Sequence, residues 1–170
     1  GWKFLGWSAD PNATAGDELP STMPAENLVF TALWTANSYD VVWVVDGAET
    51  KETYTYGSKI NTPANPVKEG YTFIGWGSDI PATMPANKLT FTAQWSINSY
   101  NVTWIVDGIE TKETYTYGSS INTPRNPVKE GCTFTGWDNT IPETMPAEDI
   151  VITGSFTVNR YKITYMLDGE

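Results

Sequence analysis

Hydrophobic and polar side chains alternate along a short segment in the second half of the chain. In 101–106, Val102 and Trp104 fall on one side of an extended strand, and Thr103 and Ile105 fall on the other. A period of two residues is that of a β-strand with one buried face. The pattern therefore predicts a strand over 101–106.

A second strand is predicted to follow at once and to form a hairpin with the first. Asp107-Gly108 is typical of a tight turn, because glycine accepts a positive φ without steric cost. Thr and Tyr alternate over 111–117, and both residue types favour strands. We expect a β-hairpin from 101 to 117.

The rest of this unit is predicted as an extended connection followed by two more strands. Pro124 and Pro127 exclude a regular helix or a central strand from 118–131. Short strands are expected over 133–137 and 150–156.

The segment Thr-Met-Pro-Ala-Glu at 144–148 is predicted to form one helical turn between these strands. Thr144 would cap the turn, and Pro146 would lie in its first turn. The fold class expected from all these elements is mainly β, and α+β at most.

The chain consists of copies of one 61-residue unit. Residues 39–99 and 100–160 align without gaps and are identical at 38 of 61 positions. Residues 1–38 match the second half of the unit, with an insertion in 8–19 that we place in a surface loop. We predict a partial repeat, two full repeats, and, in 161–170, the first strand of a truncated next repeat.

Neighbouring repeats are joined by very short segments. Only Ser96, Ile97, Asn98 and Ser99 separate the end of one repeat from Tyr100 of the next. Connections of this length leave adjacent units little freedom. We expect a semi-rigid, elongated array of modules.

Each repeat is close to the smallest size that folds alone. A chain of this length buries only about 60% of its unfolded surface. The sequence has one cysteine and hence no internal disulfide. Large apolar side chains must therefore hold each repeat together, and in 100–160 the candidates are Trp104, Tyr115, Tyr117, Phe134, Trp137 and Phe156.

Composition narrows the function further. The 170 residues carry a net charge of −10, with a pI near 4.3, and include no histidine. An acidic chain does not suit a nucleic-acid backbone, and the lack of histidine excludes His-based triads and His metal sites. No apolar run reaches the roughly 18 residues of a membrane span.

The motif Gly-Tyr-Thr-Phe-Ile-Gly-Trp at 70–76, with Pro-Ala-Asn-Pro-Val-Lys-Glu at 63–69 and Val-Asp-Gly at 45–47, resembles the Listeria–Bacteroides repeat family. This family is related to the B-repeat of internalin-type surface proteins. The resemblance implies β-grasp-like modules of about four strands, strung in tandem in secreted or wall-anchored bacterial proteins, and no shared catalytic site. The sequence departs from the internalin-type pattern where Met-Pro-Ala replaces a longer insert.

These observations favour a non-enzymatic, extracellular stalk that extends a distal domain from a bacterial cell surface, with neighbouring repeats as its partners. The alternative is an adhesin whose repeats bind host glycan or protein weakly and multivalently. Exposure of repeated aromatic rings would favour the adhesin, and burial would favour the stalk. Four tryptophans are the candidates for a sugar-stacking platform: Trp34, Trp76, Trp95 and Trp137. The repeated rings whose exposure discriminates between the two functions are Trp43, Trp104, Tyr165, Tyr54 and Tyr115.

No catalytic, cofactor-binding or metal-binding residue is predicted, and ligand-binding residues remain unassigned. Cys132 replaces an aromatic residue of the other copies and is interpreted as a neutral change. Asp46, Asp107 and Asp168 are interpreted as turn residues, and Asp79 has no counterpart in the next copy. The sequence leaves undecided whether a lysine and an asparagine form an intramolecular isopeptide bond. The candidate residues are Lys51, Lys68, Lys112, Lys129, Asn65 and Asn126.

Overall fold

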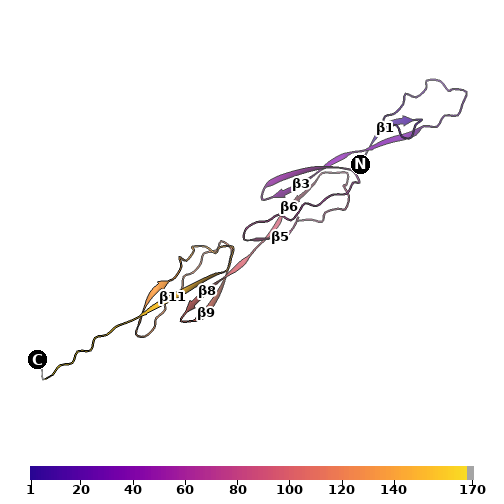
Figure 1. Ribbon diagram of the computed structural model, residues 1–170. Coiled ribbons are helices and arrows are strands. Elements are labelled where there is room, and N and C mark those ends of the chain that lie inside the picture. Colours follow the sequence, from indigo (N-terminus) through magenta and orange to yellow (C-terminus); the bar gives the residue numbers. More distant parts are fainter. Residues whose placement is uncertain (168–170) are drawn as a thin grey trace. The chain divides into compact units, whose positions relative to one another are not determined.

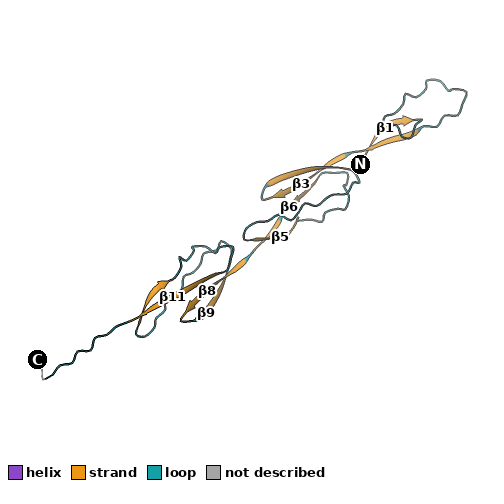
Figure 2. Cartoon of the chain, in the orientation of Figure 1, coloured by secondary structure: helices purple, strands orange, loops and turns teal. Residues whose placement is uncertain are grey.

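The computed structural model describes residues 1–167, and these residues contain strands and no helix (Figure 2). The predicted mainly β fold, built from small modules in tandem, is confirmed. The strands are β1 (Trp2–Ser8), β2 (Thr31–Ala36), β3 (Ser38–Val45), β4 (Ala48–Thr55), β5 (Tyr71–Gly75), β6 (Leu89–Thr92), β7 (Gln94–Ile97), β8 (Ser99–Val106), β9 (Ile109–Thr116), β10 (Cys132–Trp137) and β11 (Ile150–Val158).

The chain divides into two compact units. Unit 1 comprises Gly1–Pro66 and Phe73–Trp95, and unit 2 comprises Val67–Thr72 and the residues from Ser96 onward. The division passes through β5 and β7, which pair as a two-stranded sheet.

Unit 2 is built on a four-stranded sheet in the order β10-β11-β8-β9. The hairpin β8–β9 is antiparallel, and so is the pair β10–β11. The two central strands, β8 and β11, are neighbours (Figure 1). They are parallel, with Val102 opposite Ile150 and Val106 opposite Gly154. Parallel first and last strands at the centre of a mixed sheet are the β-grasp arrangement.

The predicted hairpin over 101–117 is confirmed. Ser99 pairs with Thr116 at its open end, and Val106 pairs with Ile109 beside the turn. Asp107 and Gly108 both take positive φ values, of 52° and 78°. A two-residue hairpin turn with positive φ at both positions has a twist that matches the flanking strands. This requirement explains why Asp-Gly occupies the turn.

A glycine bulge explains the repeated Phe-x-Gly-Trp motif. The register of β10 against β11 shifts between Phe134 and Gly136, and Gly136 has φ 122°. A side chain at this φ is strained, so the extra residue of the bulge is glycine. The bulge lets Phe134 and Trp137 contact each other, with ring centroids 5.3 Å apart.

The core of unit 2 lies on one face of its sheet. Its buried members are Val102, Trp104, Met145 and Ile152, each at most 4% exposed. The alternation in 101–106 therefore identified Val102 and Trp104 as core residues, although Thr103 on the opposite side is buried as well, at 8% exposure. Tyr115 and Trp137 pack against this cluster as half-buried rings.

The predicted helical turn at 144–148 is wrong. The backbone of Met145 is extended: its N–H donates to Ser119 O at 2.8 Å, and its carbonyl accepts the N–H of Gly118 at 2.9 Å. These cross-chain bonds use the groups that a helical turn would need, and they direct the Met145 side chain into the core, where it is 1% exposed. Burial of the thioether stem outweighs the local capping preference.

Unit 1 repeats this plan in 39–95. Its three-stranded sheet has the order β4-β3-β6, with β3 and β6 parallel. Its core consists of Val41, Trp43, Ile60, Trp76, Met84, Phe91 and Ala93.

The partial repeat 1–38 forms the two-stranded sheet β1–β2 of unit 1. Residues 9–30 lie in no strand, and most of them are exposed, including the inserted segment. Ser8 is fully buried and donates to Asp17 Oδ2 at 2.6 Å, which lowers the pKa of Asp17. At the other end of the chain, 161–167 forms no strand, and the assignment of 161–170 to a next repeat stays a prediction.

Candidate functional site

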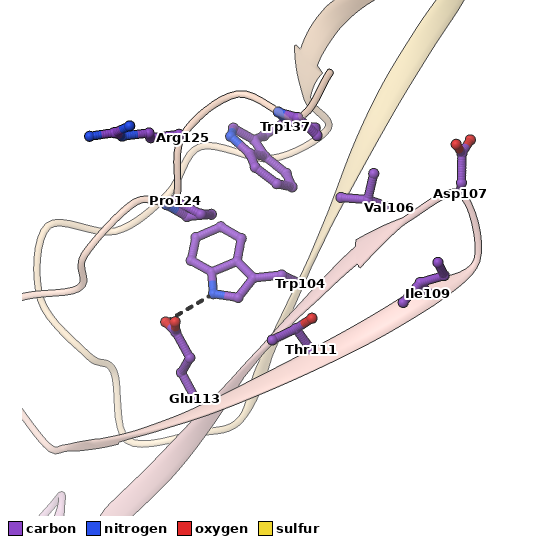
Figure 3. Close-up of a pocket in the computed structure, with 10 residues that line it drawn as sticks. Trp104, Val106, Asp107, Ile109, Thr111, Glu113, Pro124, Arg125 and Trp137 are labelled. Carbon is purple, nitrogen blue, oxygen red and sulfur yellow. Dashed lines mark hydrogen bonds between the residues drawn. The ribbon is translucent and has the colours of Figure 1, made fainter. Parts of the chain in front are cut away.

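A hollow of about 330 Å³ opens on repeat 100–160 (Figure 3). The rings of Trp104 and Trp137 meet in it at a centroid distance of 5.1 Å, and Pro124 and Arg125 lie opposite the hairpin. The lining residues are Trp104, Val106, Asp107, Ile109, Thr111, Glu113, Pro124, Arg125, Pro127 and Trp137.

Glu113 in this hollow has a structural role. Its Oε2 accepts hydrogen bonds from Trp104 Nε1 at 3.2 Å and from the Tyr115 hydroxyl at 2.8 Å. The Tyr115 hydroxyl accepts the backbone N–H of Asn122 at 3.3 Å. The hydrogen bond to Glu113 and burial raise the pKa of Tyr115. The carboxylate thus ties the hairpin, the core and the following connection together.

The same network exists in repeat 39–99. Glu52 Oε2 accepts from Trp43 Nε1 at 3.4 Å and from the Tyr54 hydroxyl at 2.6 Å, and Asn61 N–H donates to Tyr54 at 3.3 Å. Because the network recurs, we call Trp–Glu–Tyr–Asn the latch. In both copies the carboxylate binds the indole N–H and the Tyr hydroxyl, and the hydroxyl accepts the Asn backbone N–H, so the latch ties the hairpin to the connection that follows it.

The mouth of the hollow differs between the two repeats. Arg125 and Ile109 line it in repeat 100–160, whereas Ala64 and Ala48 occupy the matching positions in repeat 39–99. A ligand that contacted the charged guanidinium in one copy would meet a methyl group in the other.

The aromatic rings predicted to discriminate stalk from adhesin are divided between buried and exposed positions. Trp43 and Trp104 are 3% and 4% exposed, and Trp76 is also buried. Trp95 and Trp137 are half-buried, as are Tyr54 and Tyr115. Trp34 is 56% exposed, and Tyr165 is exposed in a segment without a strand.

Each repeat meets the next at a small set of residues that we call the seam. In unit 2 these residues are Gly70, Tyr71, Asn98, Tyr100 and Tyr117. Asn98 N–H donates to Gly70 O at 2.9 Å, and Asn98 O accepts the N–H of Tyr117 at 2.9 Å. The rings of Tyr71 and Tyr117 meet edge to face, with centroids 5.9 Å apart.

Side-chain bonds complete the seam. Thr72 Oγ1 donates to Asn98 Oδ1 at 2.6 Å, and Asn98 Nδ2 donates to the Tyr100 hydroxyl at 3.3 Å. Both sides of the Asn98 amide and both of its backbone groups are therefore engaged. The segment expected as a four-residue linker is reduced to this single residue between β7 and β8.

The seam recurs inside unit 1. Asn37 N–H donates to Gly1 O at 2.8 Å, and Asn37 O accepts the N–H of Tyr56 at 2.7 Å, while the rings of Trp2 and Tyr56 meet edge to face. Asn159 N–H likewise donates to Gly131 O at 2.8 Å. Sequence reasoning missed these asparagines, although their recurrence at 37, 98 and 159 was the available signal.

The structure places the other candidate residues at the surface or in turns. Cys132 is a half-buried free thiol on β10. Asp46 and Asp107 lie in hairpin turns, Asp79 lines a separate hollow beside Trp76, and Asp168 falls outside the described residues.

The lysines proposed for an isopeptide bond lie in exposed or half-exposed positions. Lys51 Nζ is 2.7 Å from Asp40 Oδ2, and Lys129 Nζ is 2.8 Å from Asp107 Oδ1. Lys68 Nζ lies 4.7 Å from the centre of the Tyr71 ring. Lys112, Asn65 and Asn126 are exposed, so none of these side chains occupies the apolar pocket that the cross-link requires.

Residues 1–167 bring together no group of three or more acidic or thiol side chains able to hold a metal ion. The same residues include no helix of the length and apolarity needed to cross a membrane.

Comparison with known proteins places these features in a family. The Listeria-Bacteroides repeat domain matches residues 39–99 and 100–158, and the divergent InlB B-repeat domain matches 1–38. Internalin H of Listeria monocytogenes is 36% identical over 157 residues, which cover 82% of this chain and 28% of that protein.

Two proteins of Evansella cellulosilytica, named as a Gly-rich membrane protein and a membrane protein, are each 29% identical to this chain. The matches cover 99% and 81% of this chain but only 22% and 23% of those proteins. The chain thus spans about a quarter of the length of these relatives. As its repeated motif predicted, the chain belongs to the Listeria-Bacteroides repeat domain family.

Proposed function

We propose that the chain is a non-enzymatic spacer of a bacterial cell-surface protein, exposed outside the cell, which holds a distal functional domain away from the surface. Its partners are the neighbouring repeats of the same chain. The observation that carries this proposal is the seam, in which one asparagine links the backbones of consecutive repeats.

The seam supports a spacer because it leaves a single residue, itself hydrogen-bonded, between β7 and β8. A flexible linker leaves its amides to solvent, whereas the Asn98 backbone bonds to Gly70 on one side and to Tyr117 on the other. The edge-to-face ring pair adds roughly 0.5–1.5 kcal/mol beyond the burial of its area. A compact repeat of this size adds on the order of 25–35 Å to the array.

The burial of Trp43 and Trp104 also supports a spacer. Trp43 and Trp104 donate to carboxylates inside the latch and leave little surface for a ligand. The surface is acidic overall, which keeps neighbouring arrays apart through mutual repulsion.

Small-angle X-ray scattering of the full chain tests the proposal. A variant carries six Gly/Ser residues after Asn98, and its control carries the same insertion after Thr14 in the exposed loop of 1–38. We expect the seam insertion to broaden the distribution of overall dimensions and the loop insertion to leave it unchanged. Equal scattering from native chain and seam variant would show that the seam restrains nothing, and the spacer proposal would fail.

The alternative is weak, multivalent binding to host glycan or protein. It is favoured by one observation: Trp2 and Trp34 line an open hollow of about 380 Å³ in the partial repeat. The matching positions hold Tyr71 and Trp95 in the next copy, then Cys132 and Phe156.

A glycan array probed with the full chain and with Trp34→Ala discriminates the two functions. Binding by the native chain that the substitution abolishes would replace the spacer by an adhesin. Absence of binding to any glycan supports the spacer.

A further inference from the structure

The strands through which the chain enters and leaves repeat 100–160 lie side by side. The chain enters along β8 from Ser99 and leaves along β11 toward Val158. These two strands are parallel neighbours at the centre of the sheet, with β9 and β10 on their outer sides. The two elements that carry any tension along the chain are therefore hydrogen-bonded directly to each other.

Tension applied at the two ends of the repeat acts along these strands. Val102 pairs with Ile150 near the start of both strands, and Val106 pairs with Gly154 farther along. Ser99 is pulled toward one end of the pair and Val158 toward the other. The strands must then slide past each other, which loads all the evenly spaced bonds of the parallel ladder together.

A hairpin pulled at its open end behaves differently. In β8–β9, Ser99 and Thr116 lie opposite each other at the same end. Tension between them would break the ladder one bond at a time. The resistance of a repeat thus depends on the direction in which it is pulled.

We propose that each full repeat is a load-bearing clamp, in which the parallel pair resists stretching of the chain by shear. This inference rests on the proposed spacer function and adds a mechanical role to it. The ladder of repeat 100–160 is shielded from water on one face, because Val102, Trp104 and Ile152 of these strands are buried against Met145. Water that cannot reach the bonds cannot replace them as they stretch.

Repeat 39–99 has the same clamp within unit 1. Val41 pairs with Leu89 and Val44 pairs with Thr92 in the parallel pair β3–β6, at positions 61 residues before their counterparts. The ladder is extended by Ala93, whose N–H donates to Val44 O at 2.8 Å. Two copies of one register show that the parallel pair is a property of the repeat.

Single-molecule force spectroscopy of the full chain tests the clamp. With handles at the two chain ends, we expect one unfolding event from each full repeat. Each event releases about 61 residues, or roughly 200 Å of extended chain. Forced unfolding reports the barrier to unfolding under load, so the peak force measures the clamp.

The decisive comparison changes only the pulling direction. Ile109→Cys, at an exposed position beside the hairpin turn, is combined with Cys132→Ser and pulled against the C-terminal handle. The force then acts on β8 and β11 at the same end of the pair and separates them one bond at a time. This unfolding event releases roughly 170 Å of extended chain. We expect a peak force at least about twofold lower than in end-to-end pulling of the same variant.

Urea titrations of the native chain and of the Ile109→Cys, Cys132→Ser variant show whether the two substitutions change the folding equilibrium. A second variant, Ile109→Ser with Cys132→Ser, is the matched control without an attachment site. Equal forces in the two directions, or a higher force in peeling, would overturn the clamp. The spacer would survive that result if the scattering experiment upheld the seam. Conversely, direction-dependent forces with a freely bending seam would keep the clamp and remove the spacer.

Discussion

Replacement of Met145 by alanine probes the core contact that local sequence rules placed incorrectly. Met145 is 1% exposed and belongs to the cluster with Val102, Trp104 and Ile152. Truncating a buried methionine removes its transfer free energy and leaves a cavity, at a cost of about 2–5 kcal/mol. A core of this size supplies only about 3–5 kcal/mol in total. We therefore expect repeat 100–160 of Met145→Ala to be largely unfolded, or to keep only a small free energy of unfolding.

Conservative and positional controls accompany this change. Met145→Leu keeps the volume of the side chain and is expected to cost less than about 1.5 kcal/mol. Met23 occupies the matching Thr-Met-Pro-Ala motif of the partial repeat but is 74% exposed. Met23→Ala is expected to change the stability by no more than about 0.5 kcal/mol.

The assay uses the single cysteine of the chain. Cys132 is half-buried on β10, so the rate at which its thiol is labelled during a urea titration reports unfolding of repeat 100–160 alone. This site-specific probe is needed because several repeats in one chain do not unfold as one two-state system. Met84→Ala, in the other full repeat, is expected to move the labelling midpoint far less than Met145→Ala.

Two outcomes would refute this reasoning. A labelling midpoint that is unchanged in Met145→Ala would mean that the side chain does not hold the core. A shift of the Cys132 labelling midpoint by Met84→Ala as large as that by Met145→Ala would mean that the loss of stability does not arise in the core of repeat 100–160.

Two further changes address the latch and the seam. The bond to Glu113 raises the pKa of Tyr115 in the folded chain, so the unfolded chain releases this proton first, and stability is expected to fall as the pH rises above about 10. Tyr115→Phe is expected to reduce this loss of stability in urea titrations at several pH values. An unchanged dependence of stability on pH would contradict the latch. Gly70→Ala places a Cβ on the Tyr117 ring at φ 72°, whereas Gly131→Ala at φ 69° meets no described atom within 4 Å. Both variants carry the roughly 1–2 kcal/mol cost of the left-handed backbone, and Gly70→Ala is expected to lose more stability in thermal melts; equal losses would show that the ring contact is unimportant.

The local elements were predictable because their causes are local. Alternation over 101–106 and the Asp-Gly pair identified the strand, its core residues and its turn, since side-chain period and turn chemistry depend on a few adjacent residues. The two prolines correctly kept 118–131 free of long strands.

The Met145 segment shows where local rules fail. Thr144 and Pro146 satisfy the preferences of a helix start, but the backbone of Met145 bonds to residues 118 and 119, which are far away in the sequence. No pattern within 144–148 encodes that pairing. Tertiary contact outweighed a preference worth at most about 2 kcal/mol.

The residues of the candidate site were also predictable from the sequence only in part. Sequence comparison exposed the repeat and its aromatic residues, but Asn98 looked like one polar residue of a linker. Its role depends on Gly70 and Tyr117, which approach it only after both repeats have folded.

The sequence by itself determined the repeat, the strands and the turns, because neighbouring residues control backbone conformation. Only the tertiary structure decided which strands pair across the sheet. Val102 and Ile150 meet in parallel although they are 48 residues apart, and their register follows from burying Trp104, Met145 and Ile152 in one core. That choice is made by the packing of the whole repeat, since apolar burial has no preferred direction along the chain.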